Sequence, residues 1–92
     1  MAKEERKLAF GWAGDYDAGV SYVDKTGKLS SVAGHINIRQ DGHMYAITFS
    51  DGNGNQRLIN YPTAFGLDKA QHIGEVLFPR WREESDLGRL AA

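Results

Sequence analysis

Cysteine is absent from this chain of 92 residues. The fold therefore cannot depend on disulfides, on which small secreted domains of this size commonly rely. This absence favours an intracellular compartment, and we expect the protein to be cytoplasmic.

Long hydrophobic runs are also missing. The longest apolar clusters, such as Met44–Ile47 and Val76–Phe78, are far shorter than the roughly 20 residues that a bilayer crossing requires. The segment Met1–Lys7 carries charges of both signs ahead of only a short apolar stretch, which fits neither a signal peptide nor a transit peptide. We therefore expect no membrane association.

The chain has no excess of charge of either sign. Eleven Lys and Arg residues against twelve Asp and Glu give a formal net charge of -1, with the two signs interspersed, so no electrostatic attraction to nucleic acid is expected. The composition, 41% hydrophobic and 25% charged, is that of a globular protein. The length allows one hydrophobic core. We predict a single domain over residues 1–92, with residues 1–6 as a flexible charged tip.

Alternation of apolar and other residues predicts a first strand over residues 7–13. After a glycine-bounded break, Val20–Val23 predicts a second strand that ends in a turn at Asp24–Gly27. Residues 29–33 extend a third strand. The N-terminal part of the chain therefore begins as a series of short strands joined by turns.

The segment over residues 35–49 has the clearest local pattern. Asp41-Gly42 lies between two alternating runs and predicts a two-residue type I′ hairpin. In this register Ile38 lies opposite Tyr45, one face of the hairpin is apolar, and the other is mostly polar. A second glycine-rich turn and a further strand then complete a meander.

After Pro62 the apolar residues recur at helical spacing, which predicts an amphipathic helix over about 67–78. Pro79 ends or kinks this helix, which leaves one or two C-terminal helices over about 67–90. The order of elements predicts an α+β fold. It consists of an antiparallel β-meander of four or five strands over about 7–61, with a single layer of helix packed on the sheet.

Patterns associated with metal sites are incomplete. Asp51–Asn55 carries oxygen side chains at alternate positions, like the start of a calcium loop, but the rest of that loop is missing, and a hairpin turn is favoured. In the predicted register His35 and His43 lie on opposite sheet faces, roughly 16 Å apart, which is too far for one zinc ion. His72 is interpreted as a solvated helix residue. We predict no metal site and no cofactor.

Asp15 and Asp17 flank Tyr16 in a glycine-bounded loop. Two carboxylates this close in sequence are found in acid/base sites and in magnesium sites, but they are also common in turns. No nucleophile motif accompanies them. A small enzyme that uses these carboxylates or a histidine is therefore kept as an alternative function, while we predict a protein without catalytic residues.

Aromatic and arginine side chains provide the candidates for a partner-binding site. Tryptophan, tyrosine and arginine dominate interface energetics because they bury large areas with few rotatable bonds and offer planar donors. The candidate residues are Tyr16, Phe78, Arg80, Trp81 and Arg82. The alternative interpretation is that Trp81 covers the edge of the core and its flanking arginines are solvated.

A small neutral domain without a complete chemical motif favours a non-catalytic protein-binding module. Such a module engages a larger partner through a sheet face, an edge strand or the region around Trp81. Small accessory or inhibitory proteins of phages and other mobile elements share this size and lack of motifs. One form of the hypothesis is therefore an inhibitor that acts on a larger host protein or complex. A homodimer formed through an unpaired sheet edge is compatible with it.

Nucleic-acid binding is the other alternative function. A sheet that carries Tyr22, Tyr45 and Tyr61 as stacking platforms, with Arg39 and Arg57 beside them, would bind single strands. The neutral net charge weighs against this alternative, because binding to phosphates depends on positive charge.

Overall fold

A computed structural model describes residues 7–91, with side chains described for residues 7–84. The expected flexible tip, residues 1–6, lies outside the described residues. The elements in chain order are β1 (Lys7–Trp12), β2 (Asp17–Val23), β3 (Leu29–Asp41), β4 (Met44–Ser50), β5 (Gln56–Pro62), the short 3-10 helix η1 (Thr63–Phe65) and α1 (Leu67–Ala91).

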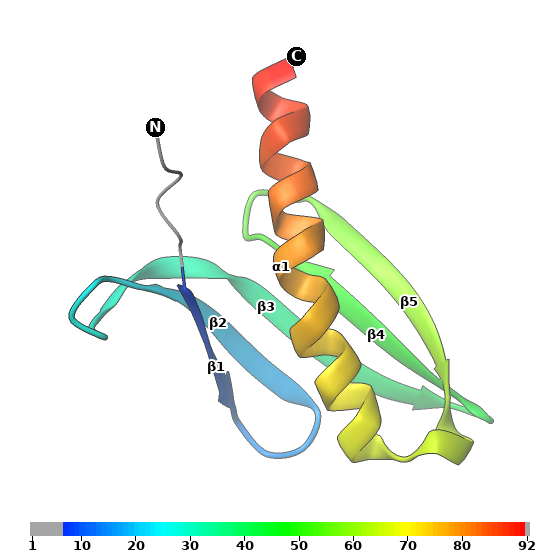
Figure 1. Ribbon diagram of the computed structural model, residues 1–92. Coiled ribbons are helices and arrows are strands. Elements are labelled where there is room, and N and C mark those ends of the chain that lie inside the picture. Colours follow the sequence, from blue (N-terminus) through cyan, green and yellow to red (C-terminus); the bar gives the residue numbers. More distant parts are fainter. Residues whose placement is uncertain (1–6, 92) are drawn as a thin grey trace.

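The strands form one five-stranded antiparallel sheet in the order β1-β2-β3-β4-β5, so each strand pairs with its neighbours in sequence. The helix α1 crosses one face of this sheet and packs on β3 and β4 (Figure 1). We call the face that α1 covers the inner face and the opposite one the outer face. This arrangement confirms the predicted α+β meander followed by a helix.

The β3–β4 hairpin turns one residue later than predicted. Asp41 pairs with Met44, so the turn residues are Gly42 and His43. Gly42 has a φ of 61°, whereas His43 does not have positive φ. Positive φ at the first turn residue alone is the type II′ pattern, while the predicted type I′ turn needs it at both. The new register changes the partners but leaves the same residues on the inner face, so the predicted apolar face is correct.

β3 is one strand of 13 residues, although separate strands were predicted on either side of Gly34. Gly34 has a φ of 155°, and its backbone lies very close to β4 and to the side chain of Phe78 on α1. A Cβ at this position would overlap the carbonyl oxygen of Ser50 and lie 2.8 Å from the ring of Phe78. The glycine that looked like a strand boundary is therefore a close-packing position inside the strand.

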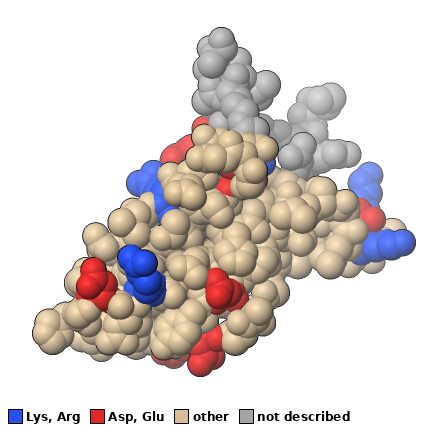
Figure 2. Space-filling view, turned by 180° about the vertical axis from the view of Figure 1, so that it is seen from behind, with Lys and Arg blue, Asp and Glu red and all other residues tan. Residues whose placement is uncertain are grey.

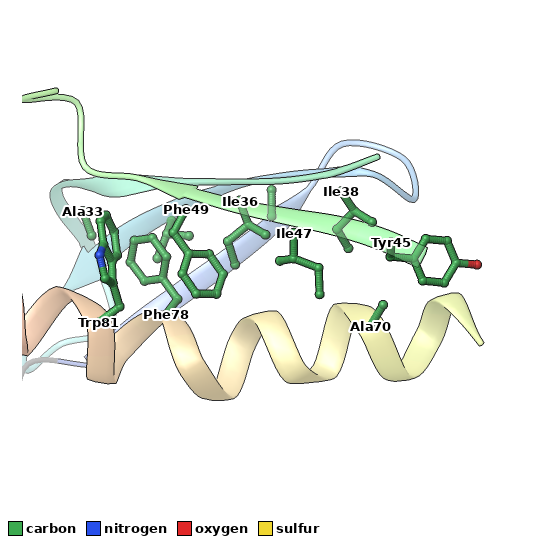
Figure 3. Packing of buried hydrophobic residues seen from close by; sticks show 11 residues of the cluster. Ala33, Ile36, Ile38, Tyr45, Ile47, Phe49, Ala70, Phe78 and Trp81 are labelled. Carbon is green, nitrogen blue, oxygen red and sulfur yellow. The ribbon is translucent and has the colours of Figure 1, made fainter. Parts of the chain in front are cut away.

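The core lies between the inner face and α1 (Figure 3). The rings of Phe49, Phe78 and Trp81 cluster in the part of the core farther from the start of α1, whereas Tyr45 lies near that start (Figure 3). The ring of Phe78 lies 5.6 Å from that of Phe49 and 5.4 Å from that of Trp81, both at steep angles that suit aromatic pairs. The buried hydrophobic residues are Ala18, Val20, Ala33, Ile36, Ile38, Tyr45, Ile47, Phe49, Ala70, Phe78 and Trp81.

α1 is a single helix of 25 residues that continues through Pro79, so of the predicted alternatives one helix is present and it does not end at this residue. Proline removes one helical hydrogen bond and crowds the preceding turn. On either side of it, however, Phe78 and Trp81 are buried in the core, and their packing favours a continuous helix. Within the described part of the chain, no helix is both long and apolar enough to cross a membrane.

A buried carboxylate, Asp51, organises the loop between β4 and β5. Its Oδ1 accepts hydrogen bonds from the backbone N–H groups of Asn53 (2.8 Å) and Asn55 (3.2 Å), and its Oδ2 accepts one from the Asn55 side chain (2.7 Å). A guanidinium nitrogen of Arg82 lies 3.8 Å from Oδ2, and Arg82 Nε donates to the carbonyl of Ala33 at 3.1 Å. The calcium-like segment is thus a turn that is tied to α1.

Candidate functional site

The outer face of the sheet is the candidate site. Within residues 7–84, no element packs over it, whereas α1 covers the inner face (Figure 1). Direct cross-strand pairing aligns its side chains in rows. One row holds Gly19, His35, Ser50 and Gln56. The next row holds Asp17, Asn37, Thr48 and Leu58, and a third holds Arg39, Ala46 and Asn60.

Small or uncharged residues make up most of this face. Gly11 and Gly19 pair directly across β1 and β2, so no side chain rises from that part of the sheet. Seen from behind, the molecule presents a broad area of uncharged atoms with isolated charged groups (Figure 2). An uncovered surface with few charges suits contact with another protein surface better than enclosure of a small ligand, which needs a concave pocket.

A polar cluster of Asp17, His35 and Asn37 lies in the middle of the outer face. The Asn37 side-chain amide donates to Asp17 Oδ1 at 2.6 Å, and His35 Nε2 lies 3.2 Å from the same oxygen. The hydrogen bond from Asn37, followed by that from His35, holds the pKa of Asp17 below its usual value of 3.8. The side chains of His35 and Asp17 are 50% and 47% exposed, so a partner has access to both.

This cluster can orient an imidazole and hold a carboxylate ionised. Those are elements of acid/base chemistry, but the cluster is half exposed to water, and the catalytic groups of enzymes normally act in water-excluded sites. Asp17 turns toward His35 and Asn37, whereas the contact recorded for Asp15 is through its backbone carbonyl, which accepts from Gln71 on α1 at 2.7 Å. The arrangement therefore fits polar recognition on an exposed surface.

The structure separates the residues predicted to bind a partner. Phe78 is fully buried and Trp81 is 9% exposed, so both belong to the core, as in the alternative interpretation of Trp81. The side chain of Arg82 is 12% exposed and faces Asp51. Of the five predicted residues, Arg80 is exposed on α1, and Tyr16, in the β1–β2 loop, is 45% exposed.

The three tyrosines of the nucleic-acid alternative do not lie on the outer face. Tyr45 is buried in the core, and Tyr22 and Tyr61 pack against it on the inner face. Arg39 lies on the outer face in the row of Ala46. The tyrosines face inward because each lies two positions along its strand from an apolar residue of the inner face, so they form no exposed stacking platform.

The histidines and acids outside the central cluster lie apart from it. His43 is a turn residue of the β3–β4 hairpin, and His72 is an exposed residue of α1. Within the described residues, no three His, Asp or Glu side chains come together in a way that suits a metal ion.

Sequence reasoning missed the Asp17, His35 and Asn37 cluster. Asp17 was assigned to a loop, but it is the first residue of β2 and pairs directly with Asn37. The signal was present in the polar alternation of His35, Asn37 and Arg39 along β3. That these residues meet Asp17 follows only from the pairing of β2 with β3, which local sequence patterns do not specify.

No family model, curated protein or solved structure matches this chain.

Proposed function

We propose that this chain is a small, non-catalytic protein-binding module that engages a larger partner protein through the outer face of its sheet. The observation that carries the proposal is that α1 covers only one of the two faces of the sheet. One face buries the core beneath α1, and the other is mainly uncharged and uncovered within the described residues (Figure 2). A scarcity of charged residues is a feature of the buried centre of protein interfaces.

The exposed large hydrophobic residues support this proposal. Leu29, Val32 and Leu58 are 64%, 78% and 59% exposed, and the pairing places all three on the outer face. Exposed apolar side chains beside polar groups are a mark of interaction sites. The central Asp17 and His35 pair would add directional hydrogen bonds to such an interface.

In its narrower form, the proposal is an accessory or inhibitory protein of a phage or other mobile element that acts on a larger host protein or complex in the cytoplasm. The small size of 92 residues and the near-neutral charge support this form. An inhibitor needs only a surface that blocks its target, and it needs no chemistry of its own.

The test is affinity purification from the native host with three tagged forms of the full chain: the original, Gly19→Arg and Val76→Arg. A Cβ at Gly19 meets nothing within 4 Å, so Gly19→Arg adds a bulky charge to the outer face without disturbing the fold. Val76 is 42% exposed on α1 and serves as the matched control.

We expect a stoichiometric protein partner that the original chain and Val76→Arg retain equally and that Gly19→Arg loses by about tenfold or more. Equal retention by all three forms would move the site away from the outer face. Retention of no protein would refute the proposed function.

A further inference from the structure

The β2–β3 hairpin extends beyond the part of the sheet that α1 covers (Figure 1). Among the exposed large hydrophobic residues of the described part of the chain, its arms bear the two with the highest exposed fractions, Val32 at 78% and Leu29 at 64%. Apolar side chains at such positions gain nothing from the protein's own core, so their exposure calls for an explanation.

Two β-bulges in β3 aim these side chains at the outer face. The register between β2 and β3 shifts between Val20 and Ser21 and again between Tyr22 and Val23. In an uninterrupted ladder, Val32 would share the inner face with Ile36. The first bulge instead places Val32 opposite Ser21 on the outer face. The second bulge then brings Leu29 opposite Val23 on that same face, and re-aiming a side chain is a known use of bulges.

Lysines surround this apolar centre. Lys7 of β1 pairs directly with Val23, and Lys25 and Lys28 lie in the exposed turn that joins β2 to β3. Basic side chains lie at this end of the molecule on either side of an acidic one (Figure 2). We call the set of Lys7, Val23, Lys25, Lys28, Leu29 and Val32 the hairpin patch.

The acid within this hairpin, Asp24, is occupied by the turn itself. Its Oδ1 accepts hydrogen bonds from the backbone N–H of Thr26 (2.8 Å), the hydroxyl of Thr26 (2.6 Å) and the backbone N–H of Lys28 (3.0 Å). These bonds fix the carboxylate against the backbone and make the turn rigid. Within residues 7–84, neither Lys25 nor Lys28 pairs with a carboxylate, so their charges are available to a partner.

We infer that the hairpin patch is the anchor of the interface and docks into an apolar recess, rimmed by Asp and Glu side chains, on the partner protein. The inference rests on the proposed function and specifies where and how the partner binds. Leu29 and Val32 fill the recess, and the lysines pair with its acidic rim. A nucleic acid fits less well, because the centre of the patch offers phosphates no hydrogen-bond donors.

The experiment is photo-crosslinking in the native host with the full chain. The photoreactive residue is placed in the patch by Val32→benzoylphenylalanine, elsewhere on the outer face by Leu58→benzoylphenylalanine, and on α1 by Val76→benzoylphenylalanine. All three sites are exposed, so the fold tolerates each change. The Val76 variant is the matched control, since it also starts from an exposed valine.

We expect the Val32 variant to form an adduct with one protein, at an apolar residue that has Asp or Glu neighbours, and the Val76 variant to form none. Leu29→Ser combined with Val32→Ser should weaken binding of that protein by about tenfold or more. Added salt should weaken it further, because exposed lysines are readily screened.

Each other outcome overturns the inference in a distinct way. An adduct from Leu58 but not from Val32 would retain the proposed function and reject the hairpin patch as its anchor. Adducts of Val32 with RNA or DNA, or with a second copy of this chain, would replace the partner inferred here. An absence of adducts from all three positions would reject both the inference and the proposed function.

Discussion

Gly34 lies where β3 comes into close contact with both β4 and α1. Its φ of 155° is unfavourable for other residues, and a Cβ there would collide with Ser50 and Phe78. We predict that Gly34→Ala lowers the free energy of unfolding by about 3 kcal/mol, because it combines backbone strain with overpacking. Urea denaturation measures this change. Gly19→Ala, whose Cβ meets nothing within 4 Å, is the control and should leave stability nearly unchanged; equal stability of the two variants would contradict the close packing at Gly34.

Trp81 and Arg80 are neighbours in sequence with opposite roles. Trp81 is 9% exposed, and its ring lies 5.8 Å from that of Phe49. We expect Trp81→Ala to cost about 4 kcal/mol of unfolding free energy, as large core truncations do. The exposed Arg80 should tolerate Arg80→Ala within about 0.5 kcal/mol. Thermal unfolding of both variants measures this contrast, and a Trp81→Ala protein as stable as the original would show that Trp81 lies outside the core. Loss of a partner on Trp81→Ala would accordingly report unfolding.

The carboxylate of Asp51 makes the free energy of unfolding depend on pH in the acidic range. Burial raises its pKa, but hydrogen bonds from Asn55 and from the backbone of Asn53 and Asn55, together with the charge of Arg82, outweigh burial and place the pKa below the ordinary value of 3.8. The ionised carboxylate therefore stabilises the fold fully above about pH 3.8, and this contribution is lost as the pH falls through the folded-state pKa.

We predict that Asp51→Asn is less stable than the original chain at neutral pH, and that the difference shrinks as the pH falls below 3.8. Chemical denaturation across that range measures the difference. A gap between the two proteins that stays constant from neutral pH down to strong acid would contradict a native carboxylate that is ionised and hydrogen-bonded.

At the scale of elements, α1 shows what helical periodicity can and cannot specify. The spacing correctly predicted a helix that begins at about residue 67, but it did not specify which of the apolar residues are buried, and Val76 is 42% exposed. The buried positions are Ala70, Gly74, Phe78 and Trp81. Because a proline normally interrupts a helix, the sequence predicted an end or a kink at Pro79. The helix does not end there, because tertiary packing of the rings of Phe78 and Trp81 favours its continuation.

We predict that Pro79→Ala raises the free energy of unfolding by about 1–2 kcal/mol. The change restores a backbone N–H and relieves crowding in the helix, and the greater freedom of the unfolded chain offsets part of the gain. Urea denaturation and circular dichroism of the full chain measure the effect. A loss of stability, or a gain in helix content without a gain in stability, would mean that α1 is not continuous at Pro79.

In the strands, too, local sequence patterns predicted some features and missed others. Alternation along residues 7–13 and the Gly-containing turns were enough to predict the meander, because period and turn chemistry are local properties. The exact turn at Gly42-His43 was missed, since Asp-Gly and Gly-His turns differ by only one residue. The bulges that turn Val32 outward were not predictable, because they arise from pairing between strands rather than from the sequence of either strand.

For the whole molecule, the fold class was more accessible to sequence reasoning than the candidate site. Burial of large aromatic residues such as Phe78 is set by the core, yet composition alone made them equally good interface candidates. The outer face exists only once five strands are paired, because Asp17 and His35 are 18 residues apart in sequence and meet through β2 and β3. A site whose residues come from different strands can therefore be identified only when the pairing register of those strands is known.

The central claim is that a protein binds the outer face and leaves the exposed side of α1 free. Hydroxyl-radical footprinting tests it most directly, on the chain alone and in the complex purified with it from the native host. We predict that Leu29 and Val32 become protected from oxidation in the complex, while Val76 oxidises equally in both states. Protection of Val76 together with unchanged oxidation of Leu29 and Val32 would contradict the claim, and so would the failure to isolate any complex.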